Sequence, residues 1–495
     1  MFLAKKEWLG AGLIGVVAAL SACDSNDDDN NAQTQQGTEL FSESIPALDS
    51  WGGVPIVGSG YGSALTPVPN QPGHFYGMTD RGPNVTAPDG SSKIEPDLAF
   101  QPAIAEFKLG NGKAEVVRTV GLALADGTPM NGHVNPEADT AETIYDIHGN
   151  VLDKSDAGLD PEGIVALPDG TFWVSDEYGP FIVHFDASGN ELLRLDPYTT
   201  DATKTAVKLP LPGEFKKRKP NKGMEGLAIT PDGKYLVGIM QSPLDQNGST
   251  KTKAGNGAIT RIVKVSLADP QGDVHEYLYQ LHTKGAKNPE GEAVSEITAL
   301  PDGTFLVDER DGNFEGTSDG TAAGTPKADK NLWKIDLSKA TDVGPLSALI
   351  GTSVGGQDVT YDPAAGLEVG GLTIEDIAGS ADGPAATTAL ANKGITVGSE
   401  SLFLAYSALF TAIDPKGMYF GHDKVEGVAV DPADPTRIYI SNDSDFGITD
   451  EPSTVPMGTE AVPFPPSEKF LPDGKTQDFG EIVKIDMNKV PAQFK

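Results

Sequence analysis

The chain is almost free of cysteine. Cys23 is its single cysteine in 495 residues, so no disulfide can form within the chain and no cysteine-rich metal site can be built. The seven histidines are scattered without the spacing of a metal-ligating pair. Two glycine-rich segments, 316–320 and 351–355, match Gly-x-Ser-x-Gly, but neither opens a helix as a nucleophile elbow must. These absences argue against thiolate-bound metals and a serine nucleophile.

Basic residues are also scarce. The chain has 37 Lys and Arg residues against 71 Asp and Glu residues, which gives a formal net charge of −34. Nucleic acid is therefore excluded as a partner, because binding it requires a basic surface. The excess of carboxylates suits a solvated surface outside the cytoplasm. It also suits clusters that hold hard cations such as calcium.

Long apolar runs are confined to the N-terminus. After Lys5 and Lys6, residues 8–20 are apolar and lead into Leu20-Ser21-Ala22-Cys23. The run is too short to span a bilayer comfortably, and the small residues before the cysteine resemble a bacterial lipoprotein signal. We expect a signal peptide at 1–22, lipidation of Cys23, and a disordered acidic tether at 23–40. The protein is then held at the bacterial cell envelope by its lipid alone, and the choice between inner and outer membrane stays open.

An apolar hairpin with carboxylates at both ends organises the remaining sequence. It runs from Asp160-Pro161-Glu162-Gly163 through a Pro-Asp-Gly turn to Asp176-Glu177, and β-branched and aromatic residues flank the turn. Related hairpins begin near residues 61, 224, 295 and 425, and each is followed by a third apolar strand. Four antiparallel strands per unit, repeated in this way, predict an all-β fold, a β-propeller, as a single domain over 41–495. We count six four-stranded blades, with five or seven left open because 338–424 could hold a divergent blade, a short helix or a cap.

The repeated carboxylates are expected to meet at one mouth of the propeller channel. The first strand of each blade lines the channel, and an antiparallel pair brings the start of that strand beside the end of the next. Calcium takes six to eight oxygen ligands at loose geometry, so such a ring forms a natural calcium site. The expected metal ligands are Asp80, Glu162, Asp176, Glu177, Glu225, Glu296, Glu309, Glu426 and Asp443.

Two arginines follow acidic residues at the ends of second strands. Arg81 and Arg310 are placed to reach the same mouth, and a guanidinium group suits phosphate or carboxylate recognition. We therefore expect a small anionic substrate and a metal-activated water, with Glu162 and Glu225 as ligands or general bases and the arginines stabilising charge. Two structural interpretations stay open. Glu-Gly pairs can serve turns, and both arginines can be buried partners of the acidic ring.

Several motifs together resemble one known family. They are Asp80-Arg81-Gly82-Pro83-Asn84, Trp173-Val174-Ser175-Asp176-Glu177-Tyr178, Gly223-Met224-Glu225-Gly226, Asp308-Glu309-Arg310-Asp311 and Val425-Glu426-Gly427. In this order they are similar to the phytase-like family with esterase-like activity, a family of exported bacterial β-propellers. The resemblance implies hydrolysis of phosphate or other esters, and the relation to alkaline phytases implies calcium.

Three functions follow as expectations. The leading one is a calcium-dependent hydrolase of small phosphorylated compounds outside the cytoplasm, which Arg81 and Arg310 favour. The second is a metal-dependent lactonase or carboxylic esterase of the gluconolactonase or paraoxonase type. The third is a non-catalytic propeller at the envelope, in which calcium only stabilises the acidic ring.

Overall fold

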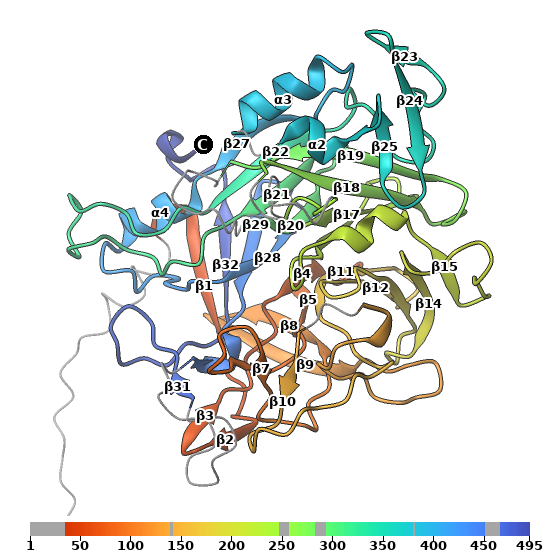
Figure 1. The fold of residues 1–495 in the computed structure, drawn as a ribbon. Coiled ribbons are helices and arrows are strands. Elements are labelled where there is room, and N and C mark those ends of the chain that lie inside the picture. Colours follow the sequence, from red (N-terminus) through yellow and green to blue (C-terminus); the bar gives the residue numbers. More distant parts are fainter. Residues whose placement is uncertain (1–34, 139–141, 247–256, 283–293, 380–381, 451–465) are drawn as a thin grey trace, which may run out of the picture.

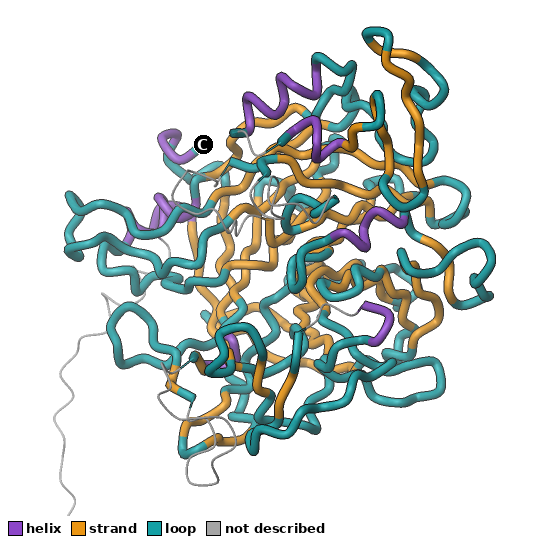
Figure 2. The backbone as a smooth tube through the Cα atoms, in the orientation of Figure 1, coloured by secondary structure: helices purple, strands orange, loops and turns teal. Residues whose placement is uncertain are grey.

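A computed structural model describes residues 35–138, 142–246, 257–282, 294–379, 382–450 and 466–495. The expected signal peptide, Cys23 and most of the tether lie outside the described residues. Strands make up most of the regular structure, with a few short helices at the periphery (Figure 2). Among the described residues, no helix has both the length and the apolar character needed to cross a membrane.

The described strands form a closed ring of sheets (Figure 1). The innermost strand of each sheet adjoins the innermost strand of the next, and the fifth returns to the first. The expected β-propeller is therefore confirmed. The described residues build five blades and not the six that we counted, so this part of the chain fits one of the alternatives left open. The inner strands are β4 (Ala64–Pro67), β11 (Pro161–Ala166), β16 (Met224–Ile229), β20 (Val294–Ala299) and β28 (Val425–Val430).

Outside each inner strand, the blade continues with antiparallel neighbours. The second strands are β5 (His74–Met78), β12 (Phe172–Asp176), β17 (Tyr235–Met240), β21 (Phe305–Glu309) and β29 (Arg437–Asn442). The third strands are β8 (Ala103–Gly110), β13 (Ile182–Phe185), β18 (Ile259–Ser266), β22 (Asn331–Asp336) and β32 (Glu481–Asp486). The fourth strands are β9 (Lys113–Gly121), β14 (Glu191–Asp196), β19 (Val274–Gln280), β27 (Ser399–Leu404) and β1 (Thr38–Glu43), and β15 (Lys208–Pro210) extends the second blade.

The ends of the described chain close the ring. Strand β1, near the N-terminus, pairs antiparallel with β32, near the C-terminus. The same strand pairs in parallel with β9 at Ser42 and Glu43, which joins the last blade to the first. Unfolding of β1 must therefore disturb both the last blade and the first.

The irregular stretch at 338–424 explains the overcounted blade. It supplies β27, which completes the fourth blade, and an insert beside the third blade (Figure 1). Ile259 and Leu278 of the third blade share a hydrophobic cluster with the insert. The insert contains β23 (Ser353–Val354), β24 (Gln357–Asp362), β25 (Gly366–Val369), β26 (Leu372–Thr373), α2 (Ile374–Ala378) and α3 (Gly383–Ala391), and α4 (Tyr406–Ile413) follows β27.

A buried ion cluster fastens the insert to the third blade. Arg261 on β18 is 1% exposed. Its Nε lies 2.8 Å from Glu375 of α2, and its Nη1 lies 2.8 Å from Glu276 and 3.5 Å from Glu214. One guanidinium group thus serves three buried carboxyl groups, so its removal leaves buried acids without a cation.

We expect Arg261→Leu to lower the free energy of unfolding by about 3–5 kcal/mol, because removing one partner of a buried ion pair leaves the other as an unpaired buried charge. Chemical denaturation measures the change. Arg437→Leu is the matched control: Arg437 is 45% exposed and pairs with Asp431 and Asp434, so its loss should cost at most about 1 kcal/mol. Equal effects of the two substitutions would contradict this role of Arg261.

Short strands and turns surround one mouth of the channel. Trp51, Ile56, Ile94, Phe446 and Ile448 form a hydrophobic cluster there with their neighbours. The strands are β2 (Asp49–Trp51), β3 (Val54–Ile56), β6 (Val85–Thr86), β7 (Lys93–Ile94), β10 (Ile144–Tyr145), β30 (Ile448–Thr449) and β31 (Ser467–Glu468). The 3-10 turns of the described residues, at this mouth and elsewhere, are η1 (Gln35–Gly37), η2 (Pro136–Ala138), η3 (Gly213–Lys217), η4 (Asp445–Gly447) and η5 (Ala492–Phe494).

Candidate active site

A β-bulge at the start of four inner strands aims one side chain into the channel mouth. The ladder between the first and second strands skips one residue in each of these blades. A bulged residue is left out of the pairing, which lets its side chain point in a new direction. The skipped residues are Glu162, Glu225, Ser295 and Glu426.

The position after a bulged glutamate requires glycine for a separate reason. A Cβ at Gly163 would lie 2.5 Å from the backbone nitrogen of Leu227 and 2.8 Å from the carbonyl oxygen of Glu225, both on the next inner strand. Inner strands therefore approach each other more closely than a side chain allows. The repeated Glu-Gly pair combines a functional position with a packing requirement.

Glu296 does not belong to this ring, which corrects our expectation. Counted back from the turn proline, Glu162, Glu225 and Glu426 stand six residues before it, whereas Glu296 stands five before Pro301. Glu296 thus takes the glycine's place. Its Oε1 accepts hydrogen bonds from the backbone nitrogens of Leu227 and Ile297 at 3.1 and 2.9 Å, inside the channel.

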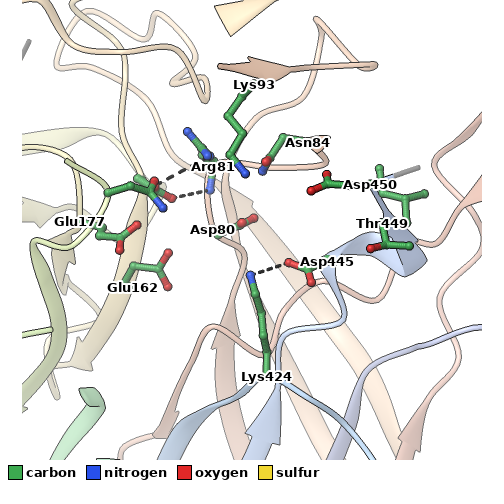
Figure 3. Close-up of a pocket in the computed structure, with 13 residues that line it drawn as sticks. Asp80, Arg81, Asn84, Lys93, Glu162, Glu177, Lys424, Asp445, Thr449 and Asp450 are labelled. Carbon is green, nitrogen blue, oxygen red and sulfur yellow. Dashed lines mark hydrogen bonds and ion pairs between the residues drawn. The ribbon is translucent and has the colours of Figure 1, made fainter. Parts of the chain in front are cut away.

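The mouth contains a cavity of about 200 Å³ beside the first blade (Figure 3). Figure 3 shows the carboxyl groups of Asp80, Glu162 and Glu177 between Arg81 on one side and Lys424 on the other. We call this cavity the first lobe. Its lining residues are Asp80, Arg81, Asn84, Lys93, Asp160, Glu162, Glu177, Asn221, Lys424, Asp445, Ile448, Thr449 and Asp450.

A second cavity of about 180 Å³ shares Glu162, Glu177, Asn221 and Lys424 with the first lobe. We call it the second lobe. The shared residues make the two lobes one polar basin across the channel mouth. Its other lining residues are Lys222, Glu225, Gln241, Val294, Ser295, Arg310 and Glu426.

Mutual repulsion and burial perturb the carboxyl groups of this basin. Burial first, and then the charges of Glu225 and Asp160, raise the pKa of Glu162 well above its usual value. Burial and the charge of Glu177 do the same for the pKa of Glu225, and burial with Asp160 raises the pKa of Glu177 to about 8. Without a cation, the basin therefore retains protons at pH values where exposed carboxyl groups have lost theirs.

Fixed cations face these acids. The Arg81 guanidinium lies 2.9 Å from Glu142 and 3.9 Å from Asp160, with its Cζ 4.9 Å from the centre of the Tyr178 ring. Burial alone would lower the pKa of Arg81, but Glu142 and Asp160 raise it above its usual value. Arg81 is thus a permanent charge in a fixed orientation.

In the second lobe, the Arg310 Nε donates to Ser295 Oγ at 2.9 Å, and its terminal nitrogen pairs with Glu426. Both of the arginines that we expected at the mouth line the basin, and both are also ion-pair partners. The salt-bridge interpretation and the substrate-binding interpretation are therefore compatible.

Three other expected ligands lie away from the basin's surface. Asp176 accepts hydrogen bonds from the backbone nitrogens of Asp160, at 2.7 Å, and Gly179, so it fixes the loop that carries Asp160. Glu309 accepts from Tyr279 and His282, turned away from the channel. Asp443 lies 3.2 Å from the Lys424 Nζ, beneath the first lobe. The hairpin pattern predicts where the second strands end, but not to which side each side chain at those ends turns.

Several basin residues were missed in the sequence. Asp160 and Lys424 each stand two residues before a bulged glutamate, and Lys222 stands three residues before Glu225. The Lys222 Nζ donates to Gln241 at 2.8 Å, and Gln241 also bonds to Glu177 and Glu225. Aligned on the turn prolines, Asp160 and Lys424 share a position with Gly223 and Ala293, so no recurring residue type marks them in the sequence.

One group of acids in the basin fits a metal ion. Ligand oxygens of Asp160, Glu162 and Glu177 all lie within 4.8 Å of one another, and all three residues are buried. Hard oxygen donors of this kind match calcium. A cation here would also relieve the repulsion that raises the pKa values of Glu162 and Glu177.

We expect the protein in chelator to lose thermal stability as the pH rises from about 5 to about 8.5. Carboxyl groups whose folded pKa exceeds their unfolded value bind protons preferentially in the folded state, so stability is lost as the pH rises through the folded pKa. Burial is the main cause for Glu43, Glu177 and Asp308, with pKa values of about 8, and for Glu95, Asp176 and Asp443, with pKa values of about 7.

Calorimetry over this pH range tests the expectation. The melting temperature should fall by several degrees, and millimolar calcium should restore part of the loss, because a ligand of the folded state adds stability by mass action. A melting temperature that rises over this range would contradict the assigned pKa directions. Restoration by magnesium as strong as that by calcium would contradict the preference for calcium.

Comparisons with solved structures give weak overall likenesses. A luciferin-regenerating enzyme is 10% identical, covers 85% of this chain and 76% of its own, and has a TM-score of 0.29. A streptogramin B lyase is 11% identical, covers 90% and 96%, and has a TM-score of 0.26. Scores this low support no functional conclusion.

A curated relative, an uncharacterized secreted protein of Arthroderma benhamiae, is 28% identical over 282 residues. The match spans 49% of this chain and 55% of the relative. The chain therefore covers about half the length of that relative.

A family model gives the assignment. The model described as phytase-like, with esterase-like activity of phytase, matches residues 58–446. This span includes the starts of all five inner strands, all residues that line the second lobe, and the first lobe except Ile448, Thr449 and Asp450. The resemblance expected from the motifs is confirmed, and the chain belongs to the phytase-like family.

Proposed function

We propose that the protein is a calcium-dependent hydrolase of phosphate esters that acts outside the cytoplasm. The observation that carries the proposal is the basin itself. Three acids that can share one cation, Asp160, Glu162 and Glu177, face Arg81 and Lys424 across the first lobe. A metal and fixed cations around one small polar cavity suit an anionic ester.

In this proposal, Asp160, Glu162 and Glu177 would hold calcium. When bound, calcium would polarise a phosphoryl oxygen and acidify a bound water. The chain's own cations bind the phosphate: Arg81 from the first lobe and Arg310 from the second. Lys424, which lines both lobes, offsets charge on the ester wherever it lies in the basin.

Glu225 is placed to act as the general base. It lines the second lobe, and its raised pKa makes it a better proton acceptor, once ionised, than an ordinary carboxylate. As a water oxygen bonds to phosphorus, Glu225 accepts the water's proton. The ester P–O bond breaks, and the proton passes to the departing alkoxide oxygen. Gln241, bonded to both Glu225 and Glu177, positions the base.

The location outside the cytoplasm rests on two observations. The N-terminus carries an apolar run that ends at a single cysteine, and the Arthroderma relative is named as a secreted protein. We propose that the mature chain begins at Cys23 and is held at the envelope by a lipid.

The test is a substrate panel on protein without its first 22 residues. A phosphomonoester, a phosphodiester and a lactone are assayed with calcium and with chelator. We expect release of phosphate in calcium and at least a hundredfold less in chelator. Turnover of the lactone alone would favour a lactonase at the same basin. Stabilisation by calcium without turnover of any substrate would leave a binding protein and overturn both enzymatic functions.

A further inference from the structure

Besides the two lobes of the acidic basin, the channel has a separate cavity at its opposite end. The inner strands run from the basin to turns that contain Pro168, Pro231, Pro301 and Pro432, and these turns surround the far mouth. The cavity has a volume of about 490 Å³ and is lined by residues of all five inner strands. Such a volume falls within the range of small-molecule sites.

The walls of this cavity are mainly apolar. Leu65, Ile164, Ile229 and Ala299 are among the lining residues. Burying such surface against a ligand is favourable by about 25 cal/mol per Å². The acidic basin, in contrast, is lined mainly by charged and amide side chains. The two ends of one channel therefore suit ligands of different chemistry.

Glu296 supplies one polar group to the apolar cavity. The residue lines the cavity and is 2% exposed. Its Oε1 accepts two backbone hydrogen bonds, from Leu227 and Ile297, whereas Oε2 has no hydrogen-bond partner among the described residues. Burial raises the pKa of Glu296 well above its usual value. In its protonated form, this carboxyl group can donate a hydrogen bond from Oε2, because Oε1 already accepts two N–H bonds.

We propose that this cavity binds a small, neutral, largely apolar molecule with one hydroxyl or carbonyl oxygen. That oxygen forms a hydrogen bond with the carboxyl group of Glu296. An unpaired buried polar atom costs about 1–3 kcal/mol, and such a ligand removes that cost. Anions are disfavoured because Asp431 lines the same cavity and the whole chain carries a net charge of −34. The site is separate from the acidic basin and independent of the proposed hydrolysis.

The experiment uses the protein without its signal peptide and the fluorescent probe N-phenyl-1-naphthylamine. Displacement of the probe by benzyl alcohol, toluene and benzylamine reports the three affinities. We expect benzyl alcohol to bind about tenfold more tightly than toluene, a difference of about 1.4 kcal/mol. Glu296→Leu should abolish this preference. Glu296→Gln, which keeps an N–H donor, should retain it.

Ala299→Trp fills the cavity and should abolish displacement by every ligand. Val207→Trp is its control, because Val207 is 49% exposed and does not line the cavity. Normal melting of each variant shows that it is folded. Wild-type affinities in Ala299→Trp, tighter binding of benzylamine than of benzyl alcohol, or no binding to the wild-type protein would each overturn the proposal.

Discussion

Glu162→Gln is expected to reduce kcat/KM for a phosphomonoester by at least about a hundredfold and to remove the stabilisation that calcium gives. Glu162 lines both lobes of the basin and belongs to the group of three acids that fits a metal ion. Loss of a metal ligand or catalytic carboxylate typically costs a factor of about 10² to 10⁴. In chelator, the substitution should not lower thermal stability. The variant should melt at the same temperature as the wild-type protein or higher, because one of several mutually repelling carboxyl groups is gone.

Glu115→Gln is the matched control, since Glu115 is exposed on β9, away from the basin. It should leave activity and the response to calcium unchanged. If Glu162→Gln destabilised the protein in chelator as much as in calcium, Glu162 would be a structural residue. Its assignment as a metal ligand would then be wrong.

Arg310→Ala is expected to weaken inhibition by inorganic phosphate at least tenfold and to lower kcat/KM by about 10² to 10³. Removal of one group that stabilises transition-state charge commonly has an effect of this size. The guanidinium bonds to Ser295 and Glu426 and lines the second lobe. Its loss therefore takes a positive charge from the substrate and also leaves Glu426 without that partner.

Two further variants separate these effects. Arg118→Ala removes a 42% exposed arginine that pairs with Glu106 on the first blade, so phosphate inhibition should not change. Glu426→Gln in the Arg310→Ala background removes the acid that was left behind and should restore stability without restoring phosphate inhibition. If stability and phosphate inhibition returned together, Arg310 would serve only to neutralise the ring.

Much of the fold could be predicted because the hairpin, its turn and the third strand recur with similar amino-acid sequences. The third apolar strand expected after each hairpin is present as β8, β13, β18, β22 and β32. The blade count could not be predicted in the same way. The insert at 338–398 packs on the outside of the third blade through a hydrophobic cluster and the Arg261 ion cluster, and no local pattern specifies such a contact.

The candidate site was predictable in position but not in full composition. Glu162, Glu225 and Glu426 share a register that the turn prolines define, and a bulge converts that register into a direction. Glu296 stands one residue closer to its turn proline than these glutamates do. Its side chain therefore lies inside the channel, where it accepts backbone hydrogen bonds, and not at the mouth. Glu309 and Asp176 stand at the expected ends of strands, but their partners, Tyr279 and a backbone loop, were set by tertiary packing.

The most direct test of the account is a calcium titration of phosphate release. Protein freed of metal by chelator is titrated with calcium, and bound calcium and turnover of a phosphomonoester are followed in the same samples. We predict that turnover rises in step with occupancy of a site that Glu162→Gln abolishes. Turnover that is complete before calcium binds, or calcium binding at that site with no phosphate released, would contradict it.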